Sequence, residues 1–135
     1  MSANTASVGE HIVHKAFPPI TRHRLALYCG ASGDHNPIHV DIDFAKQAGF
    51  PDVFSHGMLV MGYLGQALTD AVEPSRIRSF STRFAAITQL GAKLTCEGTV
   101  TELFERNGEK RARIALTTKD QNGEIKLAGE AIIAL

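Results

Sequence analysis

The segment from His56 to Val72 constrains the fold more than any other part of this chain. Its residues are almost all apolar or glycine, and Glu73 and Pro74 follow it. A helix that is hydrophobic all the way round is buried on most sides, and Ser55 is placed to cap its start. Glycine inside a helix costs about 1 kcal/mol relative to alanine, so such glycines indicate the close approach of another backbone or of a ligand. The glycines are Gly57, Gly62 and Gly65.

From residue 76 onward the hydrophobic period changes to two, which is typical of strands. We expect strands over residues 76–87, 94–104, 111–117 and 125–135, with turns at Asn107-Gly108 and Asn122-Gly123. In the second strand, Phe104 should share the apolar face with Leu94. An antiparallel meander of this kind needs a cover for its apolar face. The long helix supplies it, and a curved antiparallel sheet wrapped around one buried helix is a hot-dog fold. The expected class is α+β, with a single hot-dog domain over residues 1–135.

The composition narrows the partners that this chain could have. Its 14 basic and 14 acidic residues cancel, so no net field favours nucleic acid or an anionic membrane. The two cysteines, Cys29 and Cys96, form no disulfide framework, so we expect both to be small core residues. Their small number also predicts a reducing compartment. We expect a cytoplasmic protein, because no signal peptide or membrane-spanning run is visible. The edges and outer face of a small sheet tend to pair, so we also expect contacts between subunits.

The first half of the chain consists of short elements. Residues 11–17 precede two prolines and predict an edge strand. Thr21 can cap a helix that runs through about Cys29, and Asp41 can cap a short helix over residues 42–48. The loop between these helices carries the most informative residues of the sequence.

This loop brings a carboxylate and an imidazole within five positions of each other, as Asp34 and His39. Pro37, between them, disfavours helical geometry at Asn36 and lets the loop bend back. A carboxylate and an imidazole that share one water make a proton-transfer site. The alternative interpretation is an ordinary turn, because glycine, aspartate, asparagine and proline are the usual turn residues.

A metal site is not expected. His35 and His39 have the spacing of neighbours on a helix, but Pro37 prevents the helix that would align them. His11 and His14 fall in a predicted strand, where positions three apart point to opposite faces. The sequence contains no glycine-rich phosphate loop or dinucleotide fingerprint, so no cofactor is expected either.

The residues around this loop resemble a known family. The run from Tyr28 to His39, YCGASGDHNPIH, followed by Asp41 and Ala45, is similar to the signature of the MaoC-like, or type 2, (R)-specific enoyl-CoA hydratases. The run HGML over residues 56–59 resembles the second motif of that family. One departure is Gly65, where some of these hydratases carry serine.

The resemblance implies a function and a set of site residues. Asp34 and His39 would hold the catalytic water, and the Gly57 amide would form an oxyanion hole, with Asn36 and His56 in supporting positions. The substrate would be a trans-2-enoyl thioester of coenzyme A or of acyl carrier protein. Hydration would give the (3R)-3-hydroxyacyl thioester, and the reverse reaction would be dehydration in fatty acid metabolism. A homodimer or higher homo-oligomer is expected, with a heterodimer as the alternative.

Two other functions compete with this one. A hot-dog thioesterase commonly has a carboxylate on the central helix, where this chain offers only Gln66 and, late in the helix, Asp70. A non-catalytic subunit of a heterodimeric dehydratase would be expected to lack the pair of Asp34 and His39.

Overall fold

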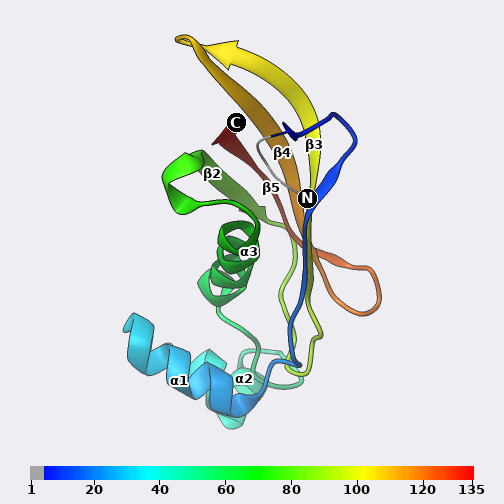
Figure 1. Ribbon diagram of the computed structural model, residues 1–135. Helices are drawn as coiled ribbons and strands as arrows, with labels where there is room; N and C mark the ends of the chain where they lie inside the picture. The colour runs from blue at the N-terminus through cyan, green and yellow to red at the C-terminus, as the bar shows by residue number, and fades with distance from the viewer. Residues whose placement is uncertain (1–4) are drawn as a thin grey trace.

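A curved antiparallel sheet and one long helix dominate the computed structural model, which describes residues 5–135 (Figure 1). The five strands lie in the order β1-β3-β4-β5-β2. Their bounds are His11–Ala16 for β1, Ile77–Phe84 for β2, Thr95–Arg106 for β3, Glu109–Lys119 for β4 and Ile125–Ala134 for β5. The sheet therefore has β1 and β2 as its edges, which confirms the predicted edge strand at residues 11–17.

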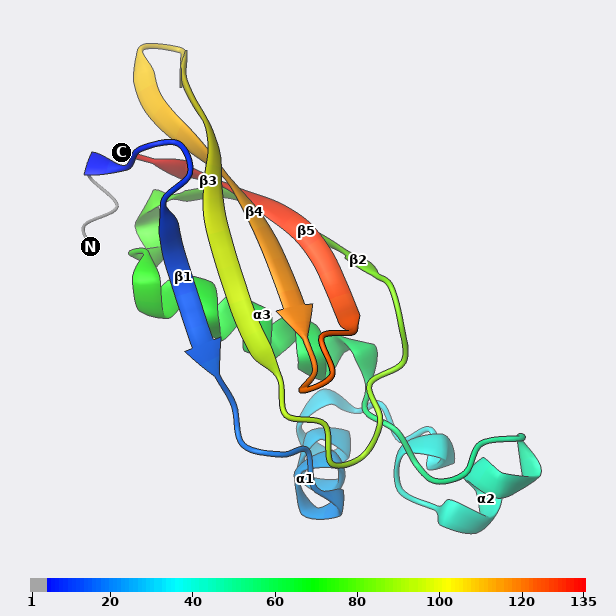
Figure 2. The same ribbon diagram turned by 90° about the vertical axis from the view of Figure 1, so that its right-hand side faces the viewer.

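The long helix α3, Gly57–Ala71, crosses the concave face of the sheet (Figures 1 and 2). One stripe of α3 faces the strands and joins the apolar core; its buried residues are Leu59, Val60, Leu64, Ala67 and Leu68. The strands contribute alternate side chains, such as Ile114 and Leu116 of β4. This arrangement confirms the predicted α+β architecture of a curved sheet around one helix.

The prediction that α3 is buried on most sides is wrong for a single chain. Met58 is 57% exposed, and Gly62 has no atom within 4 Å of the place where a Cβ would stand. The same position at Gly65 meets only the ring of Phe80, at 3.6 Å. Only the stripe toward the sheet is covered within the chain, because no second layer packs on the other side of α3 in the described residues. The expected close approach is therefore found at Gly57, where a Cβ would lie 3.0 Å from the Phe84 ring, and not at Gly62.

A β-bulge changes the predicted face of Phe104. The pairing between β3 and β4 shifts between Val100 and Glu102, so that Leu103 pairs with the buried Ala112. Phe104 then lies opposite Arg111 on the outer face, with the Arg113 guanidinium 5.7 Å from its ring. One extra residue in a strand inverts the alternation beyond it, which corrects the prediction that Phe104 shares a face with Leu94.

The N-terminal helices gather at the end of the sheet where α3 begins (Figure 1). Helix α1, Arg22–Ser32, is capped as predicted by Thr21, and it continues past Cys29 to Gly33, whose φ of 76° ends it. Helix α2, Ile42–Gln47, is capped as predicted by Asp41. Two 3₁₀ turns, η2 (Pro37–His39) and η3 (Pro74–Arg76), complete the elements.

The start of α3 differs from the prediction by one residue. His56 is the N-cap position, and its side chain makes no capping hydrogen bond to the helix. The Ser55 hydroxyl instead donates to the carbonyl of His56 at 3.0 Å, while its amide donates to the carbonyl of Thr88 at 2.8 Å. Ser55 belongs to a stretch that pairs with residues 88 and 89, and its hydroxyl donates to a backbone carbonyl instead of accepting from a helix amide.

Two further expectations concern compartment and membrane. Cys29 and Cys96 are free, buried thiols, and burial raises the pKa of both. They are core residues as predicted, while the reducing compartment and the cytoplasmic location stay predictions. Among residues 5–135, no helix has the length and hydrophobicity needed to cross a bilayer.

The contact between β2 and β5 allows a direct test of the fold. A Cβ on Gly129 would lie 2.1 Å from the Ser81 carbonyl oxygen and 2.7 Å from the Thr82 Cα. Because both are backbone atoms of the paired strand, Gly129→Ala should destabilise the protein by at least about 3 kcal/mol. Urea unfolding measures this loss. The matched control is Gly30→Ala in α1, where a Cβ meets nothing within 4 Å; equal stability of the two variants would contradict the strand pairing.

Candidate active site

The loop after α1 is braced by a chain of local hydrogen bonds. The Asp34 amide donates to the Ser32 hydroxyl at 3.1 Å, and the Asp34 carboxylate accepts from the Asn36 amide at 3.3 Å. The Asn36 side-chain oxygen in turn accepts from the Ile38 amide at 3.1 Å, which caps η2. Short polar side chains that bond to the backbone two residues on are what hold such turns. Asn36 therefore braces the turn that delivers His39.

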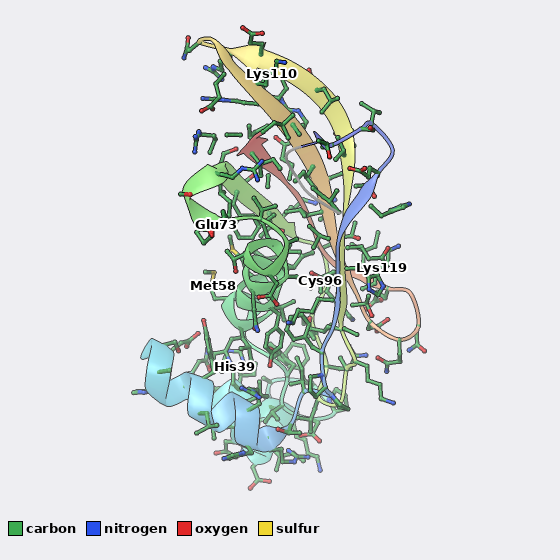
Figure 3. The ribbon with its side chains drawn as sticks, in the orientation of Figure 1. His39, Met58, Glu73, Cys96, Lys110 and Lys119 are labelled. Atoms are coloured by element: carbon green, nitrogen blue, oxygen red, sulfur yellow. The ribbon has the colours of Figure 1, made fainter. Side chains whose placement is uncertain are left out.

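The ring of His39 is fixed by a hydrogen bond to a distant backbone carbonyl. Its Nδ1 lies 2.8 Å from the Phe54 carbonyl oxygen. Because a carbonyl can only accept, Nδ1 carries the proton, and in the neutral ring Nε2 keeps the free lone pair. The side chain of His39 is buried, and Figure 3 shows it between α1 and α3.

The structure brings Asp34 and His39 together. The Asp34 Oδ2 and the His39 Nε2 lie 3.9 Å apart. This separation is longer than a direct hydrogen bond, and one water at about 2.8 Å from each atom would bridge it. The Asp34 side chain is 54% exposed, so water can reach this point from solvent. The geometry is that of a carboxylate and an imidazole aimed at one shared solvent molecule.

His56 contacts both Asp34 and His39. Its ring stacks on that of His39, with centroids 3.7 Å apart and planes 26° apart. Its Nε2 lies 3.3 Å from the Asp34 carbonyl oxygen and 3.4 Å from the Cys29 Sγ. Burial lowers the pKa of His56, and the neighbouring His39 lowers it further, which favours a neutral ring. His56 thus contacts the backbone of Asp34 and the ring of His39.

Within residues 5–135, these three residues are also the candidates for binding a metal ion. Ligand atoms of Asp34, His39 and His56 lie within 4.8 Å of one another. An imidazole binds a metal ion through a lone pair in the plane of its ring. Because the rings of His39 and His56 are stacked, an ion in the plane of one ring lies outside the plane of the other. The arrangement suits ring stacking better than shared coordination.

A cavity of about 350 Å³ lies beside the pair and reaches the start of α3. It is mostly apolar and is lined by His39, Phe54, Ser55, Gly57, Val60, Phe84, Ala85, Ala86, Ile87, Thr88 and Leu127. Gly57 is the first residue of α3, so its amide belongs to the first turn, where helix N–H groups lack intrahelical partners. A Cβ on Gly57 would lie 3.0 Å from the Phe84 ring. Asp34 is not among the lining residues and approaches His39 from the solvent side.

One wall of this cavity was missed by sequence reasoning. The predicted strand over residues 76–87 ends at Phe84, and residues 85–88 form the wall instead. The Ala85 amide donates to the Lys126 carbonyl at 2.9 Å, and the Lys126 ammonium donates to the Ile87 carbonyl at 2.8 Å. Lys126 is buried, and its ammonium pairs with Glu124 and lies 3.6 Å from the Asp120 carboxylate. No local signal marks this clamp, because its parts come from separate strands and loops.

The sequence pattern described as "MaoC like domain" matches residues 3–123. The chain belongs to the MaoC-like family. The (R)-specific enoyl-CoA hydratase of Aeromonas caviae is 32% identical over 142 residues, covering 100% of this chain and 99% of that protein. The unliganded R-hydratase PhaJ1 of Pseudomonas aeruginosa has a TM-score of 0.82 and 30% identity, over 96% of this chain and 82% of its own. These structural neighbours confirm the hot-dog fold expected for this MaoC-like chain.

Some relatives are much longer than this chain. It spans 24% of the peroxisomal enoyl-CoA hydratase 2 of Arabidopsis thaliana, to which it is 37% identical over 75 residues. The shared part covers 53% of this chain. Such relatives therefore carry further sequence that has no counterpart in residues 1–135 of this chain.

The Lys126 clamp is expected to stabilise the fold. Lys126→Met removes the ammonium and leaves Asp120 buried without its cation. Burial alone would raise the pKa of Asp120, but hydrogen bonds from Gln89 and two backbone amides, together with the charge of Lys126, hold the pKa below its usual value. Breaking a buried pair in this way should cost about 3 kcal/mol of unfolding free energy, measured in urea. The control is the exposed Lys93→Met, and an equal loss in both variants would mean that the clamp contributes nothing.

Proposed function

We propose that this chain is a hydro-lyase that adds water to trans-2-enoyl thioesters, giving (3R)-3-hydroxyacyl thioesters, and that also catalyses the reverse dehydration. The convergence of Asp34 and His39 on one water-sized gap carries this proposal. The full-length similarity to the Aeromonas caviae protein, named an (R)-specific enoyl-CoA hydratase, supports the reaction class.

The proton chemistry follows from the state of the two side chains. The free lone pair of His39 Nε2 accepts a proton from the bound water, whose oxygen adds to C3 of the enoyl group. The pair of Asp34 and His39 then returns one proton to C2 on the same face, so that the site ends in its starting state. An imidazole suits this work because its reference pKa of about 6.5 lies near the working pH. Asp34 orients the water through its exposed carboxylate.

The negative charge that develops on the thioester oxygen needs donors. The amide of Gly57, at the uncapped start of α3, supplies one beside the same cavity as His39. Free N–H groups and the helix dipole both favour an anion at this end. Loss of such a donor typically costs about 3 kcal/mol of transition-state stabilisation. Glycine at this position leaves room for the Phe84 ring, which a Cβ would meet at 3.0 Å.

The thioesterase alternative has less support. The cavity lining contains no carboxylate. Gln66 is exposed, and Asp70 pairs with Lys15 near the far end of α3. The carboxylate that does approach the site, Asp34, lies next to an imidazole, as a hydratase requires. The same pair argues against a purely non-catalytic partner subunit.

Substitution of the pair tests the proposed reaction. Asp34→Asn and His39→Gln should each lower the rate of crotonyl-CoA hydration by about 100-fold or more, because general acid–base groups contribute factors of this size. Loss of the enoyl absorbance is followed beside free-thiol release, and circular dichroism checks the fold. His35→Gln, an exposed neighbour in the same loop, is the control.

Each other outcome has a distinct meaning. Thiol release without hydration would favour a thioesterase. Near-full activity in either variant would remove that residue from the mechanism.

We also propose that two copies of this chain associate, with a heterodimer as the alternative. Among residues 5–135, strand β2 pairs only with β5 and leaves one edge free. The face of α3 around Met58 and Gly62 is exposed, and an apolar helix face of this kind is usually covered. A second copy lying along β2 would cover both features.

Two helical glycines test this association. Gly62 in α3 and Gly30 in α1 both have open space where a Cβ would stand. Gly30→Ala should stabilise the chain by about 1 kcal/mol through helix propensity alone. Gly62→Ala should weaken the dimer, because the added methyl group meets the partner. Sedimentation equilibrium measures the dissociation constant, and a Gly62→Ala variant that dimerises as the wild type does would place the contact elsewhere.

A further inference from the structure

A second, largely apolar hollow lies next to the proposed catalytic cavity. It has a volume of about 290 Å³ and is lined by Phe50, Pro51, Asp52, Val53, Phe54, Ile87, Gln89 and Leu90. Phe54 and Ile87 line both hollows. These two side chains therefore form a partition between the proposed catalytic cavity and the second hollow. The proposed reaction assigns no role to this second hollow.

The second hollow offers little to a polar ligand. Its two polar side chains are already engaged: the Asp52 carboxylate binds the Arg22 guanidinium at 2.8 and 2.6 Å, and the Gln89 amide donates to Asp120 at 3.1 Å. The pantetheine arm of a thioester carries amides, which lose free energy if they are buried without partners. A hydrocarbon chain gains free energy in such a place. The chemistry of the lining thus favours the acyl end of the substrate.

The two members of the partition are held differently. The carbonyl of Phe54 accepts the His39 hydrogen bond, and its ring packs edge-on to His39 at 5.5 Å and against Phe50 at 4.8 Å. Phe54 cannot move without disturbing His39. The Ile87 carbonyl accepts a hydrogen bond from the Lys126 ammonium, which fixes the backbone of Ile87. The residue as a whole is nevertheless 50% exposed. The Ile87 side chain is therefore the part of the partition that can change without disturbing His39.

We infer that the second hollow takes the distal part of the acyl chain and that Ile87 sets the length of chain that the site accepts. This inference rests on the proposed hydratase function. Short enoyl groups end at the partition, whereas longer ones must pass the Ile87 side chain to reach Phe50 and Leu90. Each methylene that becomes buried there should raise kcat/KM by about fourfold.

Two variants with opposite effects test the inference. Ile87→Ala opens the partition and Ile87→Phe closes it, while Leu103→Ala, an exposed apolar residue on the β3–β4 hairpin, is the control. The measurement is kcat/KM for hydration of trans-2-enoyl-CoA substrates with 4, 6, 8 and 10 carbons, with wild-type protein as reference. Ile87→Ala should raise the ratio of 8-carbon to 4-carbon rates by about tenfold. Ile87→Phe should lower this ratio, and Leu103→Ala should leave it unchanged.

The possible failures can be told apart. An unchanged length profile in both Ile87 variants would overturn the inference, while the hydratase proposal would stand. An equal change at every length would assign the hollow to pantetheine, and a change in sedimentation mass would assign Ile87 to a subunit contact; either result would also overturn it. A wild-type protein that hydrates none of the four substrates would overturn the proposed function itself.

Discussion

The packing of one helical stripe into a curved sheet determines where everything else lies. Leu64 and Leu68 of α3 meet Ile114 and Ile133 of the sheet in one continuous apolar core. Side chains of this size contribute roughly 1.5–3 kcal/mol each when fully buried. The stripe fixes the rotation of α3 about its axis and its position along the sheet. As a result, the amide end of α3 points to the edge of the core where α1 and the loop after it arrive (Figure 1).

The chemistry at that end depends on backbone groups more than on side chains. The Phe54 carbonyl decides which nitrogen of His39 carries the proton, and the Asp34 carbonyl holds the His56 ring. Both carbonyls belong to segments that are tied down elsewhere in the fold. Because neither bond involves Nε2 of His39, the ring is oriented while this nitrogen keeps a free lone pair. A fixed imidazole beside a half-exposed carboxylate is an arrangement that lets water enter without loosening the site.

Local patterns in the sequence predicted those parts of the structure that depend on neighbours in the chain. The change of hydrophobic period at residue 76 predicted a sheet after a helix, and Thr21 and Asp41 cap their helices as expected. The short spacing and Pro37 predicted a loop that can aim Asp34 and His39 at one point, and the resemblance to the hydratase signature favoured this prediction over an ordinary turn.

Other features depend on residues that are far apart in sequence, and local patterns could not predict them. The bulge near Thr101 adds one residue to a strand whose composition reads as regular. The clamp of Lys126 on Ile87 joins positions 39 apart. The exposed side of α3 was predicted to be buried, because an apolar sequence does not indicate whether the same chain or a partner covers it.

The two ends of the proposed substrate site are constrained to different degrees, and this difference has a consequence for specificity. At the chemical end, His39 is tied to Phe54, His56 and Asp34, so a change in any one of them alters the others. At the acyl end, one of the two side chains of the partition, Ile87, makes no contact with His39 and stands on a fixed backbone. On the proposed function, substitutions at Ile87 would therefore alter the volume available to the acyl chain without moving His39. A site built in this way would keep one reaction while the length of its substrate is set independently, by packing alone.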